Sequence, residues 1–156
     1  MSDVTDAIKD LFGKIHSQSQ RTHAGVVIAT AAILDSQLED ALKRAMRPMS
    51  KGRYKTLFDP FRPLGDFAGK IAMAYALGIV SEEVFRELEK IRKIRNLFAH
   101  STEHLHLGSV EVAPLFATLK RPHMNGTIRD IEWFVRCAKA VGDSLKEYMK
   151  RMGERP

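Results

Sequence analysis

The residues best suited to chemistry are an arginine, an asparagine and a histidine in the run RNLFAH at positions 95–100. Asn96 and His100 are four residues apart, so in a helix their side chains share one face, and Arg95 lies beside them. An arginine can hold phosphate oxygens through two parallel hydrogen bonds, and a histidine can transfer a proton near neutral pH. Such a group could cleave RNA without a metal. The alternative is structural: Arg95 pairs with a buried acid, Asn96 caps a backbone group and His100 ends a helix.

The helix that must carry this run is predicted over residues 81–100. Ser81 is a favourable N-cap, and the two glutamates after it suit the positive end of the helix dipole. Arg95 interrupts an apolar stripe, and a desolvated guanidinium needs a partner or a path to solvent. The apolar residues expected in the core are Val84, Leu88, Ile91, Ile94 and Phe98.

A possible acidic partner lies in a helix predicted over residues 22–46. One stripe of that helix places Asp35 and Glu39 among Ile28, Ala32, Leu42 and Met46. If this stripe faces the helix over 81–100, either acid could neutralise Arg95 or Arg92, or orient His100. If it lies at the boundary with solvent, both acids are hydrated, since acids are rarely buried without a partner.

The remaining periodicity predicts an all-α fold, a single-domain bundle of about five helices spanning residues 1–156. Helices are expected over 4–19, 22–46, 66–77, 81–100 and from Thr127 or Asp130 to Gly153. Residues 48–63 should contain no regular helix because Pro60 and Pro63 interrupt them. Residues 101–126 should be irregular, with a short strand or hairpin around 110–112 and 116–119. The long apolar seam of the final helix should pack against the helix over 22–46 or against a second copy.

The connector over residues 48–63 is basic and aromatic. Arg53 and Tyr54, together with Phe58, Phe61 and neighbouring cations, could stack on and hold single-stranded RNA. Alternatively, Phe58 and Phe61 fill the core while the charges keep the connector hydrated. We favour this second interpretation because large aromatic side chains are usually buried.

Composition limits the class of protein. The net charge of +6 permits a polyanionic partner such as RNA or DNA without requiring one. A single cysteine, Cys137, excludes an internal disulfide and fits a reducing compartment such as the cytoplasm, and its position suggests an inert buried thiol. Nothing resembles a signal peptide or a membrane span. His100, His104 and His106 have no clear fourth ligand nearby, so we expect no metal and no other cofactor.

A longer pattern resembles the mannitol operon repressor (MltR) family, mainly between Thr22 and His100. It comprises Leu34-Asp35-x-x-Leu38-Glu39, Leu57-Phe58, Gly65-Asp66-Phe67, KIAMAYALGIV at 70–80 and IRKIRNLFAH at 91–100. Asp66 departs from the serine expected there, but both residues can cap a helix. The run Arg95-Asn96-x-x-Ala99-His100 also resembles the R-x4-H motif of the HEPN superfamily.

The first resemblance implies a bacterial transcriptional regulator of the repressor type, helical and without a helix-turn-helix. The sequence agrees, because the helix after the turn at Gly78–Val80 begins with Ser81-Glu82-Glu83, which would repel phosphate. We therefore expect a regulator that works through a protein partner or nucleic acid, as a homodimer. The HEPN resemblance implies the alternative, a metal-independent endoribonuclease. In that enzyme His100 handles the proton, Arg95 holds the phosphate and Asn96 positions either one.

Overall fold

The fold is entirely helical throughout the part of the chain that the structure describes. This computed structural model describes residues 2–120 and 130–153, with side chains from residue 23 onward. No strand occurs in these two segments, which confirms the predicted all-α class. The helices are α1 (Ser2–Ala45), α2 (Lys51–Phe58), α3 (Phe67–Ala76), α4 (Glu82–His100), α5 (Ala113–Phe116) and α6 (Asp130–Gly153).

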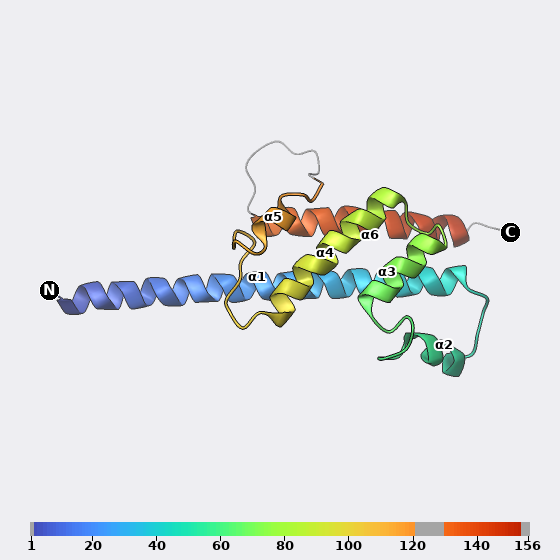
Figure 1. The fold of residues 1–156 in the computed structure, drawn as a ribbon, viewed down its shortest axis with the longest axis horizontal. Coiled ribbons are helices and arrows are strands. Elements are labelled where there is room, and N and C mark those ends of the chain that lie inside the picture. The colour runs from blue at the N-terminus through green and yellow to red at the C-terminus, as the bar shows by residue number, and fades with distance from the viewer. Residues whose placement is uncertain (1, 121–129, 154–156) are drawn as a thin grey trace.

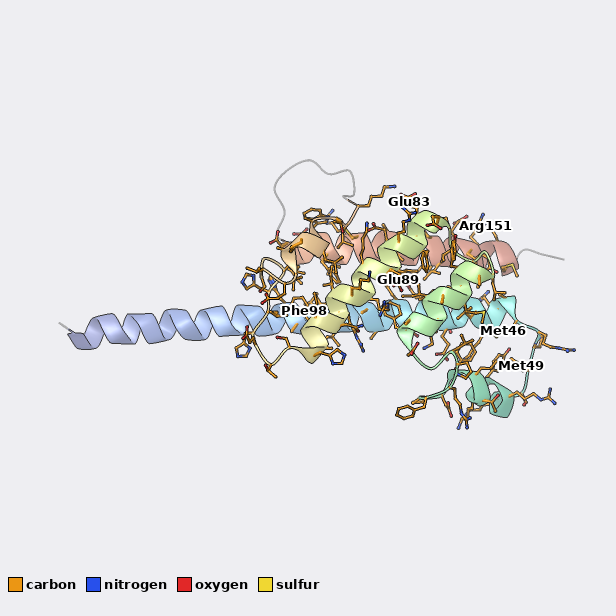
Figure 2. The ribbon with its side chains drawn as sticks, in the orientation of Figure 1. Met46, Met49, Glu83, Glu89, Phe98 and Arg151 are labelled. Atoms are coloured by element: carbon orange, nitrogen blue, oxygen red, sulfur yellow. The ribbon has the colours of Figure 1, made fainter. Side chains whose placement is uncertain are left out.

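The helices form two layers (Figure 1). α1 and α6 lie side by side and run in the same direction, and α3 and α4 cross in front of them. The N-terminal half of α1 extends beyond the bundle, while α2 lies off its opposite end. Met46 and Met49 lie where the chain leaves α1 and turns toward α2 (Figure 2). Because α4 crosses α1, the end of α4 packs over the middle of α1.

The core lies between the two layers and follows the predicted apolar stripe of α4, except that Val84 is only half-buried. The final helix packs on α1 within the same chain, as its seam suggested. Arg95 shares the α4 stripe but is half-buried. The buried apolar residues of these three helices are Val27, Ala31, Leu34, Leu38, Ala41 and Leu42 from α1, Leu88, Ile91, Ile94 and Phe98 from α4, and Phe134, Cys137, Ala138, Val141 and Leu145 from α6.

Local signals set the helix ends that position the site. The Ser81 hydroxyl accepts a hydrogen bond from the Val84 backbone N–H at 3.2 Å, which confirms the N-cap of α4. Asp66 caps α3 in the same way, accepting from the Gly69 N–H at 2.6 Å. Gly78 has φ +68°, so the turn into α4 uses the left-handed region that glycine adopts most easily.

Two predictions of local structure were wrong. The helices expected over 4–19 and 22–46 are one continuous helix, because residues 17–21 contain neither glycine nor proline to interrupt it. The connector over 48–63 contains α2, which fits between Pro48 and Pro60 and is capped by Ser50. Eight residues between two prolines suffice for two helical turns.

The segment after α4 also differs from expectation. Residues 110–112 and 116–119 form turns and the short helix α5, with no strand. The buried residues of this segment, Val112, Phe116 and Leu119, are four and three positions apart, as in a helix or turn. A strand would instead bury every second residue. Residues 121–126 and the proposed helix start at Thr127 lie outside the described residues.

Candidate functional site

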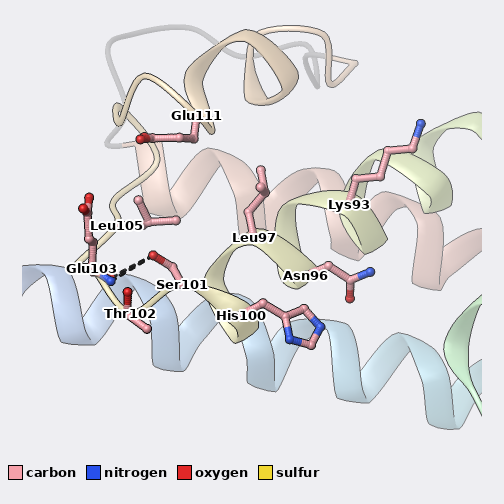
Figure 3. A pocket seen from close by; sticks show the side chains of 9 residues that line it. All are labelled: Lys93, Asn96, Leu97, His100, Ser101, Thr102, Glu103, Leu105 and Glu111. Atoms are coloured by element: carbon pink, nitrogen blue, oxygen red, sulfur yellow. Dashed lines mark hydrogen bonds between the residues drawn. The ribbon is translucent and has the colours of Figure 1, made fainter.

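An open groove of about 650 Å³ lies where α4 ends and the chain turns back toward α5 (Figure 3). One side comes from the last two turns of α4, and the other from the loop that follows. The lining residues are Lys93, Asn96, Leu97, His100, Ser101, Thr102, Glu103, Leu105 and Glu111.

Apolar anchors and one imidazole hold the loop wall of the groove. Leu105 and Leu107 are buried in the core on either side of His106. The Leu107 backbone N–H donates to Nδ1 of His23 on α1 at 3.5 Å. Burial, and then the nearby His106, lowers the pKa of His23, which favours the neutral ring that can accept this bond. The wall is thereby fastened to α1.

The predicted trio is only partly brought together. Asn96 and His100 point to one side of α4 and both line the groove (Figure 3). Arg95 does not line it, but its Nη1 donates to Asn96 Oδ1 at 3.0 Å. His100 is exposed, and no described residue holds its ring by a hydrogen bond. The amide thus links the guanidinium to the groove, while the imidazole is free to reorient.

Three charged residues of the groove were missed by sequence reasoning. Lys93 stands on α4, and Glu103 and Glu111 stand on the loop. The i, i+3 and i+7 spacing of Lys93, Asn96 and His100 could have indicated Lys93. Ser101 has a structural role, since its Oγ accepts from the Glu103 N–H at 3.1 Å and closes the turn. One cation and two acids give the lining of the groove mixed charge.

Of the two alternatives for Asp35 and Glu39, the partnership with the α4 arginines is not found, and both acids keep part of their exposure to solvent. Both carboxylates bind Lys70 of α3, whose Nζ lies 2.9 Å from Asp35 Oδ2 and 3.2 Å from Glu39 Oε2. This part of α1 faces α3, so the acids are out of register with Arg95. Lys70 is only 3% exposed and takes a core position on α3. A lysine in the apolar run FAGKIAMA was the signal that could have identified it.

Burial and pairing act in opposite directions on this cluster. Burial lowers the pKa of Lys70, but the hydrogen bond and charge of Asp35, with those of Glu39, outweigh it and raise the pKa overall. Burial likewise raises the pKa of Glu39, but hydrogen bonds from Lys43 and Lys70 lower it overall. Lys70 and Glu39 therefore keep their charges at neutral pH, and the cluster fastens α3 to α1.

The other proposed support residues lie away from the groove. Arg92 forms a two-pronged pair with Glu89, through Nε at 3.0 Å and Nη2 at 2.9 Å. Tyr54 is half-buried, and the Lys43 ammonium lies 5.5 Å from its ring centroid. Arg53 is exposed on α2. None of the three contributes to the wall around His100.

Three further features of the described segments bear on function: candidate metal ligands, the Cys137 thiol and the hydropathy of the helices. No group of three histidine, cysteine, aspartate or glutamate side chains there could hold a metal, including His100, His104 and His106. Cys137 is buried, and burial, followed by the charge of Glu87, raises its pKa to about 11. The thiol is therefore unreactive near neutral pH. No described helix is long and apolar enough to cross a bilayer.

Fold and site together define a class: an all-helical bundle with an open, mixed-charge groove at one helix end. A chain of the X-ray structure of the MtlR–HPr complex from Escherichia coli is similar to this one, with a TM-score of 0.52 and 17% identity. The similarity covers 81% of this chain and 87% of that chain, and at this identity it shows the fold. Neither a protein-family model nor a curated protein matches the sequence.

Proposed function

We propose that this chain is a regulatory protein of the MtlR kind that works by docking a partner protein in the groove at the end of α4. The observation that carries the proposal is the shared fold with a chain of a regulator–HPr complex, which covers most of both chains. An HPr-like protein is the proposed partner. The groove is shallow and carries both signs of charge, as a polar rim of a protein interface does.

The geometry favours binding over turnover. A catalytic imidazole must be held in one orientation, and a phosphate-binding guanidinium must reach the reacting atoms. No described residue holds the His100 ring by a hydrogen bond. Arg95 does not line the groove, and its guanidinium is hydrogen-bonded to Asn96. The groups can therefore contact a partner as they stand, whereas catalysis would require both to move.

Calorimetric titration with purified HPr tests the proposal. The wild-type chain should form a one-to-one complex, and Lys93→Glu combined with His100→Ala should weaken it by about tenfold, because the first change reverses a charge of the groove and the second removes its exposed imidazole. Lys139→Ala is the matched control, since this cation lies on α6 with 71% of its side chain exposed. Equal affinity of the groove variant and the wild type would contradict the assignment of the groove.

A second candidate function is the metal-independent endoribonuclease. It is favoured by one observation: Asn96 and His100 share the groove, and Arg95 is bonded to that same asparagine. Structured RNA incubated with the chain in excess EDTA distinguishes the candidates. Cleavage that His100→Ala abolishes, with an unchanged melting curve, would replace the regulator proposal by the enzyme.

We further propose that the regulator works in the cytoplasm as a homodimer. The supporting feature is the N-terminal half of α1, which extends beyond the bundle. Its sequence places Ala7, Ile8, Leu11, Phe12 and Ile15 at helical spacing, the pattern of a helix that packs on another. Sedimentation equilibrium should give twice the chain mass, and a chain beginning at residue 22 should give the monomer mass.

A further inference from the structure

The turn after α2 holds a phenylalanine in a conformation that usually belongs to glycine. Asp59, Pro60, Phe61 and Arg62 form a β-turn closed by a hydrogen bond from the Arg62 N–H to the Asp59 carbonyl at 3.0 Å. Phe61 has φ +65°. Proline at the second position and positive φ at the third define a type II turn, in which the third residue is normally glycine or asparagine. A bulky residue there is strained.

Nothing in the fold offsets that strain, because the Phe61 side chain is 105% exposed. The expectation that Phe58 and Phe61 both fill the core was thus half wrong: Phe58 is buried and Phe61 projects into solvent. The turn is held firmly, since the Leu64 N–H donates to the Leu57 carbonyl at 2.8 Å. The ring is presented on a fixed scaffold that lies off the two helical layers (Figure 1).

The chain segment that carries this ring is strongly basic. Residues 47–62 contain five cations and a single acid, Asp59, giving a net +4 of the chain's +6. All five cations are exposed, and the ion pairs among described side chains involve none of them. They are Arg47, Lys51, Arg53, Lys55 and Arg62.

We propose that this basic turn, residues 47–62, binds single-stranded nucleic acid, with a base stacked on Phe61 and phosphates on the surrounding cations. A base offers a flat face to the ring, and its backbone offers the anions that these cations lack within the described chain. The site is separate from the α4 groove and does not depend on the proposed regulator–HPr contact.

A protein partner fits these observations less well. Of the other large apolar side chains of the turn, Phe58 is buried and Met49 and Leu57 are half-buried, so Phe61 is the one fully exposed ring in the segment. Tyr54 offers no second platform, because Lys43 lies over its ring. One stacking surface on a cation-rich segment matches the way single strands are held, by stacking and electrostatic attraction together.

Fluorescence anisotropy with a labelled single-stranded oligonucleotide of about 20 nucleotides tests the proposal, since such a length exceeds the site sizes of about 4–16 nucleotides found for single-strand-binding folds. The wild-type chain should bind at low salt, and affinity should fall as salt rises. Phe61→Gly should bind roughly five- to a hundredfold more weakly, the range measured for losing one base–aromatic stack. Its melting temperature should stay equal or rise, because glycine relieves the positive φ.

Two variants separate stacking from general effects. Phe61→Trp should restore binding, because it keeps a stacking face. Val110→Gly, which removes an 86% exposed apolar side chain far from the turn in sequence, should bind like the wild type. Equal binding by Phe61→Gly and the wild type, no binding by the wild type, or binding only to anionic vesicles or to HPr at this turn would each overturn the proposal.

Discussion

Replacing Lys70 by methionine tests the most heavily buried charge in the described structure. The ammonium is 3% exposed and bridges Asp35 and Glu39 across α1 and α3. Methionine keeps most of the side-chain volume but removes the charge, so two carboxylates lose their shared cation. Glu39 keeps its ion pair with Lys43, but Asp35 Oδ1 already lacks a hydrogen-bond partner in the structure, so the loss falls mainly on Asp35.

The magnitude follows from the burial of the acids. Breaking a fully buried pair by removing one partner costs about 3–5 kcal/mol, because the remaining charge is desolvated and unpaired. Here the Asp35 and Glu39 side chains retain 32% and 27% of their surface exposure, so water relieves part of the penalty. We expect Lys70→Met to lose about 2–3 kcal/mol of unfolding free energy. At roughly 2–4 °C per kcal/mol, the melting temperature falls by about 4–12 °C.

Urea denaturation followed by far-ultraviolet circular dichroism measures this loss. The control Lys139→Met removes an exposed cation paired with Asp143 and should stay within about 0.5 kcal/mol of the wild type. The pKa of Glu39 is lowered in the folded state, so its contribution holds above the ordinary value of 4.5 and is lost as pH falls through the folded pKa. The difference between Lys70→Met and wild type should therefore shrink in acid. Equal stability of Lys70→Met and wild type at neutral pH would refute this reasoning.

Three further predictions concern the thiol, the groove wall and the turns. Cys137, with its pKa raised to about 11, should react with a thiol reagent at pH 8 only after urea unfolds the chain. The pKa of His23 is lowered, so its neutral ring accepts the Leu107 hydrogen bond at and above pH 6.5, and the bond is lost as pH falls through the folded pKa. Hydrogen exchange of the Leu107 amide should then become faster relative to its intrinsic rate. Gly78→Ala should cost about 1 kcal/mol at its positive φ, whereas Gly52→Ala, within α2 and with open space around it, should gain about 0.5–1 kcal/mol in the same denaturation assay.

The sequence was most informative where structure is decided locally. The cap at Ser81, the left-handed Gly78 and the apolar stripe of α4 each depend on residues within a turn or two of one another. Those signals correctly placed Asn96 and His100 on one face. The helix α2 was missed because Pro60 and Pro63 were taken to exclude a helix from the whole connector, whereas α2 ends at Phe58, before both of them.

The hydrophobic pattern of the sequence could not predict which side chains on different helices pair with each other. The stripe of α1 correctly indicated that Asp35 and Glu39 need a partner, but the crossing of α1 with α3 decides that the partner is Lys70. The loop wall of the groove was likewise hidden, because Leu105 and Leu107 are buried one at a time in an irregular segment. The strain at Phe61 has no periodic signature, since it arises from the order of Pro60 and Phe61 in a single turn.

Chemical-shift mapping of the isotopically labelled chain during titration with unlabelled HPr tests the central proposal most directly. Docking at the end of α4 predicts that the largest amide shifts fall within residues 93–111, with Asn96 and His100 among them and the cations of α2 unaffected. An absence of shifts at saturating HPr, or shifts confined to helices remote from this groove, would contradict the proposed site.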